Sequence, residues 1–206
     1  MLINLTLISI IDYGVGNLKS IKKAIENLGA NVVITKQASM IESSDALILP
    51  GVGAFPEAIQ NLKPLMNIIY DFVKNGKPIF GICLGLQLLF SESREGGYFK
   101  GLNLLKGSIV KLPESLKIPH IGWNSINIVK HNPLIDGVKN GSYVYFAHSY
   151  IASNFDPEIA IAYTNYGIDF PSIISSEHIY ATQFHPEKSG KVGLKILKNF
   201  VNLVRK

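Results

Sequence analysis

The stretch Pro78-Ile79-Phe80-Gly81-Ile82-Cys83-Leu84-Gly85-Leu86-Gln87-Leu88-Leu89-Phe90 decides the fold. Its first half, through Ile82, predicts the end of a buried strand, and the leucines from Leu84 onward predict a helix packed on that strand. Cys83, the only cysteine of the chain, then lies at a sharp strand-to-helix turn between two glycines, in the arrangement of a nucleophile elbow. A helix N-terminus favours the negative charge of a thiolate. A buried core cysteine is the alternative interpretation.

Length and composition fit one compact α/β domain over residues 1–206, with 47% hydrophobic residues. The opening 1–11 is apolar but short and lacks a basic start, so it predicts a first strand and not a signal peptide, and no segment reaches transmembrane length. A single cysteine excludes an internal disulfide and is typical of a reducing compartment. We therefore expect a cytoplasmic protein that does not bind a membrane.

The net charge of +5 raises the question of nucleic-acid binding. Arg94 and Arg205 are the only arginines, and no basic run is interleaved with aromatic residues. The lysines are scattered or recur at helical spacing, which indicates a solvated face. We therefore expect no nucleic-acid partner.

Hydrophobic periodicity predicts alternating strands and helices up to Phe90, which favours a parallel sheet with helices on both faces. The predicted strands are 5–11, 30–35, 45–49 and the one that ends at Cys83, and the predicted helices are 18–28, 56–70 and a short one before Gly76. After Phe90 the pattern becomes β-rich. The predicted strands there are 102–112, 125–129, 143–150, 159–163 and 179–184, followed by a closing amphipathic helix over 190–204.

A cysteine nucleophile needs a base, and the base needs a group that orients it. Among the five histidines, only His185 follows a predicted strand and has a carboxylate, Glu187, two residues on. Side chains at i and i+2 of an extended segment point the same way, so Glu187 can bind one imidazole nitrogen while the other faces Cys83. A plain polar loop is the alternative for this His-Pro-Glu segment.

An oxyanion site is predicted where Pro50-Gly51-Val52-Gly53 follows a buried strand. The carboxyl ends of parallel strands share one edge of the sheet, so these residues are expected near Cys83. Glycines let the amides of 51–53 turn toward a tetrahedral intermediate, beside the amide of Leu84. Taken alone, the segment is also compatible with an ordinary turn.

Three motifs in this order, Pro-Gly-Val-Gly at 50–53, Gly-Ile-Cys-Leu-Gly-Leu-Gln at 81–87 and Gln-Phe-His-Pro-Glu-Lys at 183–188, resemble the class I, triad-type glutamine amidotransferases. The resemblance covers the whole chain. It implies the flavodoxin-like fold of that class: an α/β fold with a mostly parallel central sheet, helices on both faces and an antiparallel β extension. It also implies a cysteine glutaminase with the catalytic residues Cys83, His185 and Glu187.

Further stretches resemble one branch of that class, the glutaminase subunits of imidazole glycerol phosphate synthase from histidine biosynthesis. They are Asp-Tyr-Gly-Val-Gly-Asn-Leu at 12–18, Pro-Gly-Val-Gly-Ala-Phe at 50–55, Pro-His-Ile-Gly-Trp-Asn at 119–124 and Tyr-Phe-Ala-His-Ser-Tyr at 145–150. Ile121 stands where that branch usually has Met, and Ala147 where it often has Val. Neither departure changes the chemistry.

This narrower resemblance implies a substrate and a partner. Glutamine would be held by four matched residues, Gln87, Glu95, Ser149 and Tyr150. Ammonia would pass to a (β/α)₈-barrel cyclase subunit that makes imidazole glycerol phosphate and the purine precursor AICAR. The partner would meet Asn17, Trp123, Tyr145 and Lys188. An exposed helix position for Gln87, a strand end for Ser149 and Tyr150, and a core position for the lone Trp123 are the alternatives.

Other functions stay open at this point. A paralogous glutaminase that feeds a sugar-modifying amidotransferase of surface-polysaccharide synthesis has a similar sequence. A silent regulatory subunit is a different class, and it has no chemical need for the whole triad. We expect no metal, because the histidines are not clustered, and no dinucleotide, because Lys19 replaces the third glycine after Gly14 and Gly16.

Overall fold

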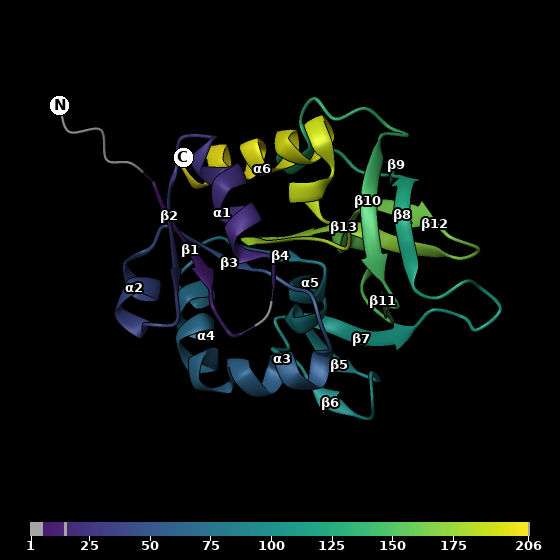
Figure 1. Cartoon of the computed structure of the whole chain (residues 1–206), viewed down its shortest axis with the longest axis horizontal. Coiled ribbons are helices and arrows are strands. Elements are labelled where there is room, and N and C mark those ends of the chain that lie inside the picture. The colour runs from purple at the N-terminus through teal and green to yellow at the C-terminus, as the bar shows by residue number, and fades with distance from the viewer. Residues whose placement is uncertain (1–5, 15, 206) are drawn as a thin grey trace.

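The computed structural model describes residues 6–14 and 16–205, whose strands form three sheets (Figure 1). The largest has eight strands in the order β2-β1-β3-β4-β14-β13-β12-β9. These strands are β1 (Leu7–Ile11), β2 (Asn31–Thr35), β3 (Ala46–Leu49), β4 (Ile79–Ile82), β9 (Asn127–Ile128), β12 (Ala160–Asn165), β13 (Asp169–Ser176) and β14 (Ile179–Thr182).

The eight-stranded sheet is parallel at one side and antiparallel at the other. Strands β2, β1, β3, β4 and β14 pair in parallel, whereas β13, β12 and β9 continue the sheet with antiparallel pairs. The parallel part comes from strand–helix–strand units with buried strands. The predicted fold class, a mostly parallel sheet with an antiparallel extension, is confirmed.

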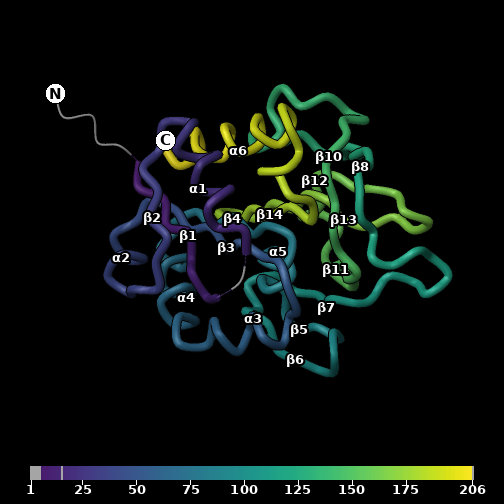
Figure 2. The backbone as a smooth tube through the Cα atoms, in the orientation of Figure 1, coloured from purple at the N-terminus to yellow at the C-terminus, as the bar shows by residue number. Residues whose placement is uncertain are grey.

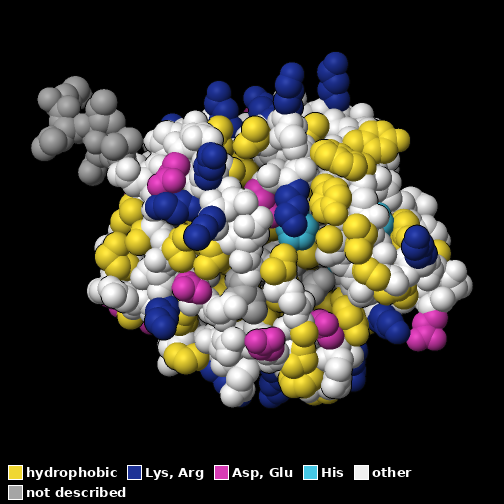
Figure 3. Space-filling model, in the orientation of Figure 1, with side chains coloured by type: hydrophobic (Ala, Val, Ile, Leu, Met, Phe, Trp, Pro, Cys, Tyr) yellow, Lys and Arg dark blue, Asp and Glu magenta, His cyan; other side chains and the backbone are white. Residues whose placement is uncertain are grey.

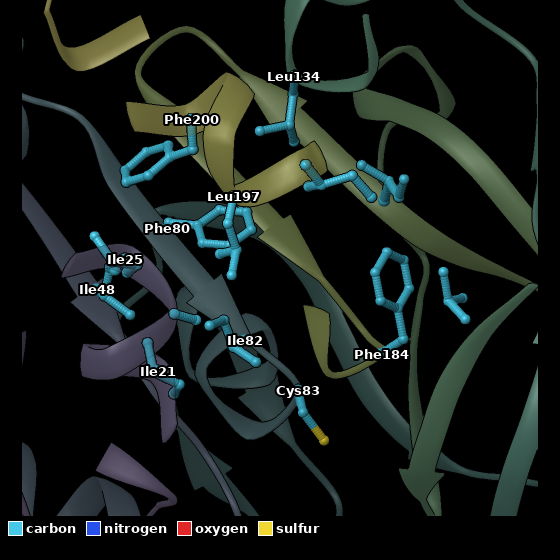
Figure 4. Close-up of a cluster of buried hydrophobic side chains, with 14 of the residues drawn as sticks. Ile21, Ile25, Ile48, Phe80, Ile82, Cys83, Leu134, Phe184, Leu197 and Phe200 are labelled. Carbon is cyan, nitrogen blue, oxygen red and sulfur yellow. The ribbon is translucent and has the colours of Figure 1, made fainter. Parts of the chain in front are cut away.

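Helices cover both faces of this sheet (Figure 1). They are α1 (Leu18–Glu26), α2 (Ala38–Ser43), α3 (Phe55–Leu62), α4 (Met66–Lys74), α5 (Leu84–Leu89) and α6 (Gly190–Val204). On β3, Ile48 packs into the core under α1 and α6, and Leu47 packs into the core under α3 and α4. Because successive strand residues point to opposite faces, two cores form on one sheet. Figure 4 shows the first core, in which the Phe80 and Phe200 rings stack at 4.9 Å.

Two smaller sheets stand beside the main one, and Figure 2 traces how the chain enters them after α5. One is the antiparallel pair β8 (His120–Ser125) and β10 (Tyr143–His148). The other has the order β11-β7-β5-β6 and consists of β5 (Phe90–Ser93), β6 (Phe99–Lys100), β7 (Leu105–Lys111) and β11 (Tyr150–Ser153). These sheets carry the part of the chain whose pattern is β-rich.

Several predicted boundaries are wrong. The helix expected over 56–70 is divided by a 3-10 turn at Lys63–Leu65, because Pro64 has no N–H to donate. The strand expected over 143–150 is two strands, β10 and β11, which belong to different sheets on either side of Ser149. The expected strand 125–129 is the end of β8 followed by β9. Leu5 of the first predicted strand lies outside the described residues.

Candidate active site

The turn between β4 and α5 holds Cys83 in a backbone conformation that side chains rarely adopt, with φ 52° and ψ −105°. Gly81 and Gly85, the glycines on either side of Cys83, are required because a side chain would not fit at either position. A Cβ on Gly85 would lie 1.9 Å from the Leu49 carbonyl oxygen, and one on Gly81 would lie 2.8 Å from the Gly85 carbonyl carbon. The Cys83 sulfur points away from the apolar cluster beneath it (Figure 4). The turn therefore has the geometry of a nucleophile elbow.

His185 and Glu187 lie next to this elbow, at the end of β14 and in the 3-10 turn Pro186–Lys188. Nδ1 of His185 lies 3.0 Å from Oε1 of Glu187, and the two side chains are 2% and 1% exposed. Nε2 of His185 has no nitrogen or oxygen partner within the described part of the chain. It is therefore free to exchange a proton with the Cys83 sulfur.

The protonation of His185 depends on both neighbours. Burial lowers its pKa, but hydrogen bonds to Cys83 and Glu187, together with their negative charges, raise it more, so the resulting pKa is about 9. The imidazolium form is thus stable at neutral pH beside two acidic groups. The Cys83 thiol lies beside the His185 base, and Glu187 orients that base, which is the arrangement that thiol acyl transfer requires.

The predicted oxyanion residues divide into two groups. Val52, Gly53 and Leu84 line one cavity with Cys83. Gly51 lies behind them, where a Cβ would come within 2.4 Å of the Leu84 Cβ. The glycine at 51 thus lets the 50–53 segment pack directly on the start of α5. Gly53, at φ +112°, has a conformation that favours glycine.

The cavity has a volume of about 280 Å³, and all four predicted glutamine-binding residues, Gln87, Glu95, Ser149 and Tyr150, line it. Gln87 is buried and its Nε2 donates a 3.0 Å hydrogen bond to the Tyr150 carbonyl, so an exposed helix position is wrong. Glu95 accepts from the Phe55 N–H at 3.0 Å. Burial raises the pKa of Glu95, and that hydrogen bond opposes the rise.

Three of the four residues predicted to face a partner gather at the edge of the cavity, which Lys188 itself lines. The rings of Trp123 and Tyr145 lie 6.1 Å apart, and Nζ of Lys188 lies 5.9 Å from the Tyr145 ring centre. Trp123 is 56% exposed, so the alternative of a core position is wrong. Asn17 stands before α1, and no described contact joins it to this group. Figure 3 shows apolar side chains over β8 and β10 on this side of the molecule.

Sequence reasoning missed three residues at the site. Nε2 of Gln183 donates to the Cys83 sulfur at 3.7 Å, and the sulfur lies equally 3.7 Å from the Ala147 carbonyl. The Tyr13 hydroxyl donates to the Pro50 carbonyl, just before the oxyanion segment. Burial and then the charge of Cys83 raise the pKa of Tyr13. The i, i+2 spacing from His185 back to Gln183 was the one available signal.

A family model for glutamine amidotransferase class-I matches residues 9–203. The chain therefore belongs to the class-I glutamine amidotransferase family. It is 50% identical over 201 residues to "Imidazole glycerol phosphate synthase subunit HisH" of Caldanaerobacter subterraneus, covering 97% of this chain and 99% of that protein. It is 51% identical over 198 residues to the protein of the same name from Methanocaldococcus jannaschii, covering 96% and 100%.

Solved structures share the fold at low sequence identity. A glutamine amidotransferase superposes with a TM-score of 0.76 at 18% identity, covering 96% of this chain and 99% of that chain. PurLQS from Thermotoga maritima superposes with a TM-score of 0.73 at 18% identity, covering 97% and 99%. Within residues 6–14 and 16–205, no helix has the length and apolar character needed to cross a membrane.

Proposed function

We propose that this protein is the glutaminase subunit of an imidazole glycerol phosphate synthase in histidine biosynthesis. It hydrolyses glutamine to glutamate and ammonia through Cys83, His185 and Glu187 in one domain spanning 1–206. The observation that carries the proposal is the buried His185–Glu187 pair, 3.0 Å apart, whose histidine lines the same cavity as the strained Cys83. The relatives at 50% and 51% identity bear the name of that synthase subunit.

The reaction proceeds in two halves. The Cys83 thiolate attacks the side-chain carboxamide carbon of glutamine, and the His185 imidazolium gives its proton to the departing nitrogen, so the C–N bond breaks and ammonia leaves. Water then attacks the glutamyl thioester while neutral His185 takes a proton from it. Cleavage of the C–S bond releases glutamate and restores the thiolate–imidazolium pair. Glu187 fixes the imidazole tautomer and stabilises the imidazolium.

The segment 51–53 and Leu84 stabilise the tetrahedral intermediate with their backbone amides. Gly51 and Gly53 permit a peptide rotation in this segment, so the oxyanion site can be completed when a partner binds. Gln87, Glu95, Ser149 and Tyr150 hold the glutamine. The Glu95 carboxylate suits the α-ammonium group, whose charge offsets the cost of burying that carboxylate.

Ammonia passes directly to a (β/α)₈-barrel cyclase, which makes imidazole glycerol phosphate and AICAR. The exposed Trp123 and the half-buried Tyr145 beside it, with Lys188, support a protein interface beside the cavity, and Asn17 belongs to the same proposed contact. The free thiol nucleophile fits a reducing, cytoplasmic compartment.

Glutamate release from glutamine tests the proposal, measured for the chain alone and with a cyclase barrel carrying its nucleotide ligand. We expect little activity alone and a strong rise with the loaded barrel, with Cys83→Ala as the blank. If the loaded barrel leaves the chain silent while Cys83 still reacts with thiol reagents, the histidine-pathway partner is wrong. The sugar-modifying amidotransferase of polysaccharide synthesis would then be the acceptor to test.

A further inference from the structure

A buried pair of histidines lies beside the cavity and outside the proposed triad. His120 begins β8 and His148 ends β10, and the two are register partners in that antiparallel pair. They are 3% and 5% exposed, and Nδ1 of His120 lies 3.0 Å from Nε2 of His148. His148 lines the cavity that contains Cys83.

The partners of these rings determine where each proton lies. Nδ1 of His148 lies 3.0 Å from the Tyr150 carbonyl oxygen, which can only accept, so Nδ1 carries a proton. Burial lowers the pKa of His148 to about 3; the hydrogen bond to the Tyr150 carbonyl opposes this, the nearby charges of His120 and His185 add to it, and the ring is neutral. A neutral ring with its proton on Nδ1 has a bare Nε2. His120 must therefore donate to it through Nδ1.

The other end of the pair is anchored independently. Burial lowers the pKa of His120 to about 4, so its Nε2 is an acceptor, and Nδ2 of Asn124 lies 3.4 Å away. The orientation of the Asn124 amide is fixed because Nδ2 also donates to the Asn165 carbonyl at 2.9 Å. The His120 ring is stacked between Phe146 and Tyr166, at centre distances of 4.8 Å and 4.0 Å. Ring rotation is thereby opposed.

This series of hydrogen bonds ends at Gln87, one of the residues proposed to hold the substrate. The Tyr150 carbonyl that accepts from His148 also accepts from Nε2 of Gln87 at 3.0 Å. An acceptor at that place requires the NH₂ side of the Gln87 amide, so Oε1 is left as the acceptor for a ligand. A carbonyl held from two sides fixes both the position and the orientation of the Gln87 amide.

We propose that His120 and His148 are positioning residues for the amino-acid substrate. Hydrogen bonds donated from Asn124 to His120 and from His120 to His148 orient the His148 ring. His148 holds the Tyr150 carbonyl, which in turn holds the Gln87 amide. This inference rests on the proposed glutaminase function. Neither histidine touches the reacting bond. Loss of these hydrogen bonds therefore weakens glutamine binding and leaves the chemistry of Cys83 and His185 nearly unchanged.

Asparagine and glutamine replacements separate the two ring nitrogens, because Asn places an NH₂ near Nδ1 and Gln places one near Nε2. The probe is a chloromethyl ketone analogue of glutamine. The Cys83 thiolate attacks its CH₂Cl carbon, so an S–C bond forms, the C–Cl bond breaks and chloride leaves. Saturation kinetics on the intact chain give a binding constant KI and a maximal rate kinact. Iodoacetamide reports the intrinsic reactivity of the thiol.

For His148→Gln we expect a rise in KI of about tenfold, since a donor to a buried carbonyl is lost, with kinact and the iodoacetamide rate within about twofold of wild type. His148→Asn keeps the donor and should restore KI to within about threefold. His131→Gln, on a side chain that is 84% exposed, is the matched control and should change nothing. Equal KI values for the Asn and Gln variants would overturn the proposal.

Asn124→Asp provides a second variant, at a residue that does not line the cavity. Its carboxylate cannot donate, so it draws the proton of His120 to Nε2 and removes the donor to His148. We expect KI to rise, and ¹⁵N NMR to show the His120 proton on Nε2 instead of Nδ1. The exposed control Asn127→Asp should leave both KI and the His120 tautomer unchanged. An unchanged KI with the proton moved would refute the positioning role. If the wild-type chain shows no saturable inactivation at all, the proposed function itself fails.

Discussion

Cys83 combines the reactive thiol with a backbone conformation, φ 52° and ψ −105°, that costs about 1–3 kcal/mol. Replacing it with glycine removes this strain, whereas replacing it with alanine keeps it. We predict that both variants lose activity, and that Cys83→Gly has a free energy of unfolding about 1 kcal/mol higher than Cys83→Ala. Urea denaturation measures the difference. Ala24→Gly, in the ordinary helix α1, is the control, and there glycine should lower the free energy of unfolding relative to alanine. If glycine changed that free energy in the same direction at both sites, the strain at Cys83 would be contradicted.

The raised pKa of His185 sets the pH dependence of the reaction. Burial lowers this pKa, but Cys83 and Glu187 raise it to about 9. Departure of ammonia needs the imidazolium, so kcat/KM should fall as pH rises through about 9. Glu187→Gln removes one negative charge, and we predict that the falling limb moves to lower pH. An unchanged limb in Glu187→Gln would show that another group is responsible for it.

The same shift predicts a pH dependence of stability. The folded pKa of His185 is about 9 and its ordinary value is 6.5, so the folded protein binds the proton more tightly. The resulting stabilisation is complete below pH 6.5 and is lost as pH rises through about 9. Urea midpoints of wild type and His185→Gln should therefore differ less at high pH than at pH 6.

At the scale of the elements, the elbow depends on the close approach of α5 to β3. A Cβ at Gly85 would lie 1.9 Å from the Leu49 carbonyl oxygen, which is backbone and cannot move alone. We predict that Gly85→Ala destabilises the protein by about 3 kcal/mol or more, measured by chemical denaturation. Gly141→Ala meets nothing within 4 Å and has only its φ of +78° to accommodate, so it should cost about 1 kcal/mol. Equal effects would contradict the packing argument.

Sequence periodicity predicted those elements whose pattern is continuous. Helix α6 spans Gly190–Val204 as expected, because its apolar positions repeat at helical spacing without interruption. Strand β13 was missed although its interior is buried, because Pro171 within it argues against a strand. The division of 143–150 at Ser149 was also missed. Both strands there are β-prone, and only their pairing with different partners separates them.

The candidate site was predictable where residue types and spacing specify the chemistry. The His185–Glu187 contact was predicted from the i, i+2 spacing of an extended segment, whereas the structure forms it across the start of the 3-10 turn Pro186–Lys188. The buried His120–His148 contact joins residues 28 positions apart, and no local pattern predicts it. The exposure of Trp123 is likewise a property of the register between β8 and β10, in which Trp123 lies opposite Tyr145.

At the scale of the whole molecule, the side carrying β8 and β10 is suited to a partner. Ile121 and Tyr143 are each 61% exposed near Trp123, at 56%. We predict that Trp123→Ala weakens binding to the cyclase barrel by about 2 kcal/mol, roughly thirtyfold in Kd, and leaves the stability of the free chain within about 0.5 kcal/mol. Calorimetric titration measures the affinity. Leu194→Ala, on α6 and 42% exposed, is the control and should bind normally.

The whole account depends on a glutamyl thioester at Cys83. The most direct measurement is a rapid quench of the complex with isotopically labelled glutamine, followed by mass spectrometry of the peptide that contains residues 78–90. The account predicts one glutamyl group on Cys83, removed by hydroxylamine, and none in Cys83→Ala, which should also release no glutamate. Glutamate release by Cys83→Ala at the wild-type rate would contradict it.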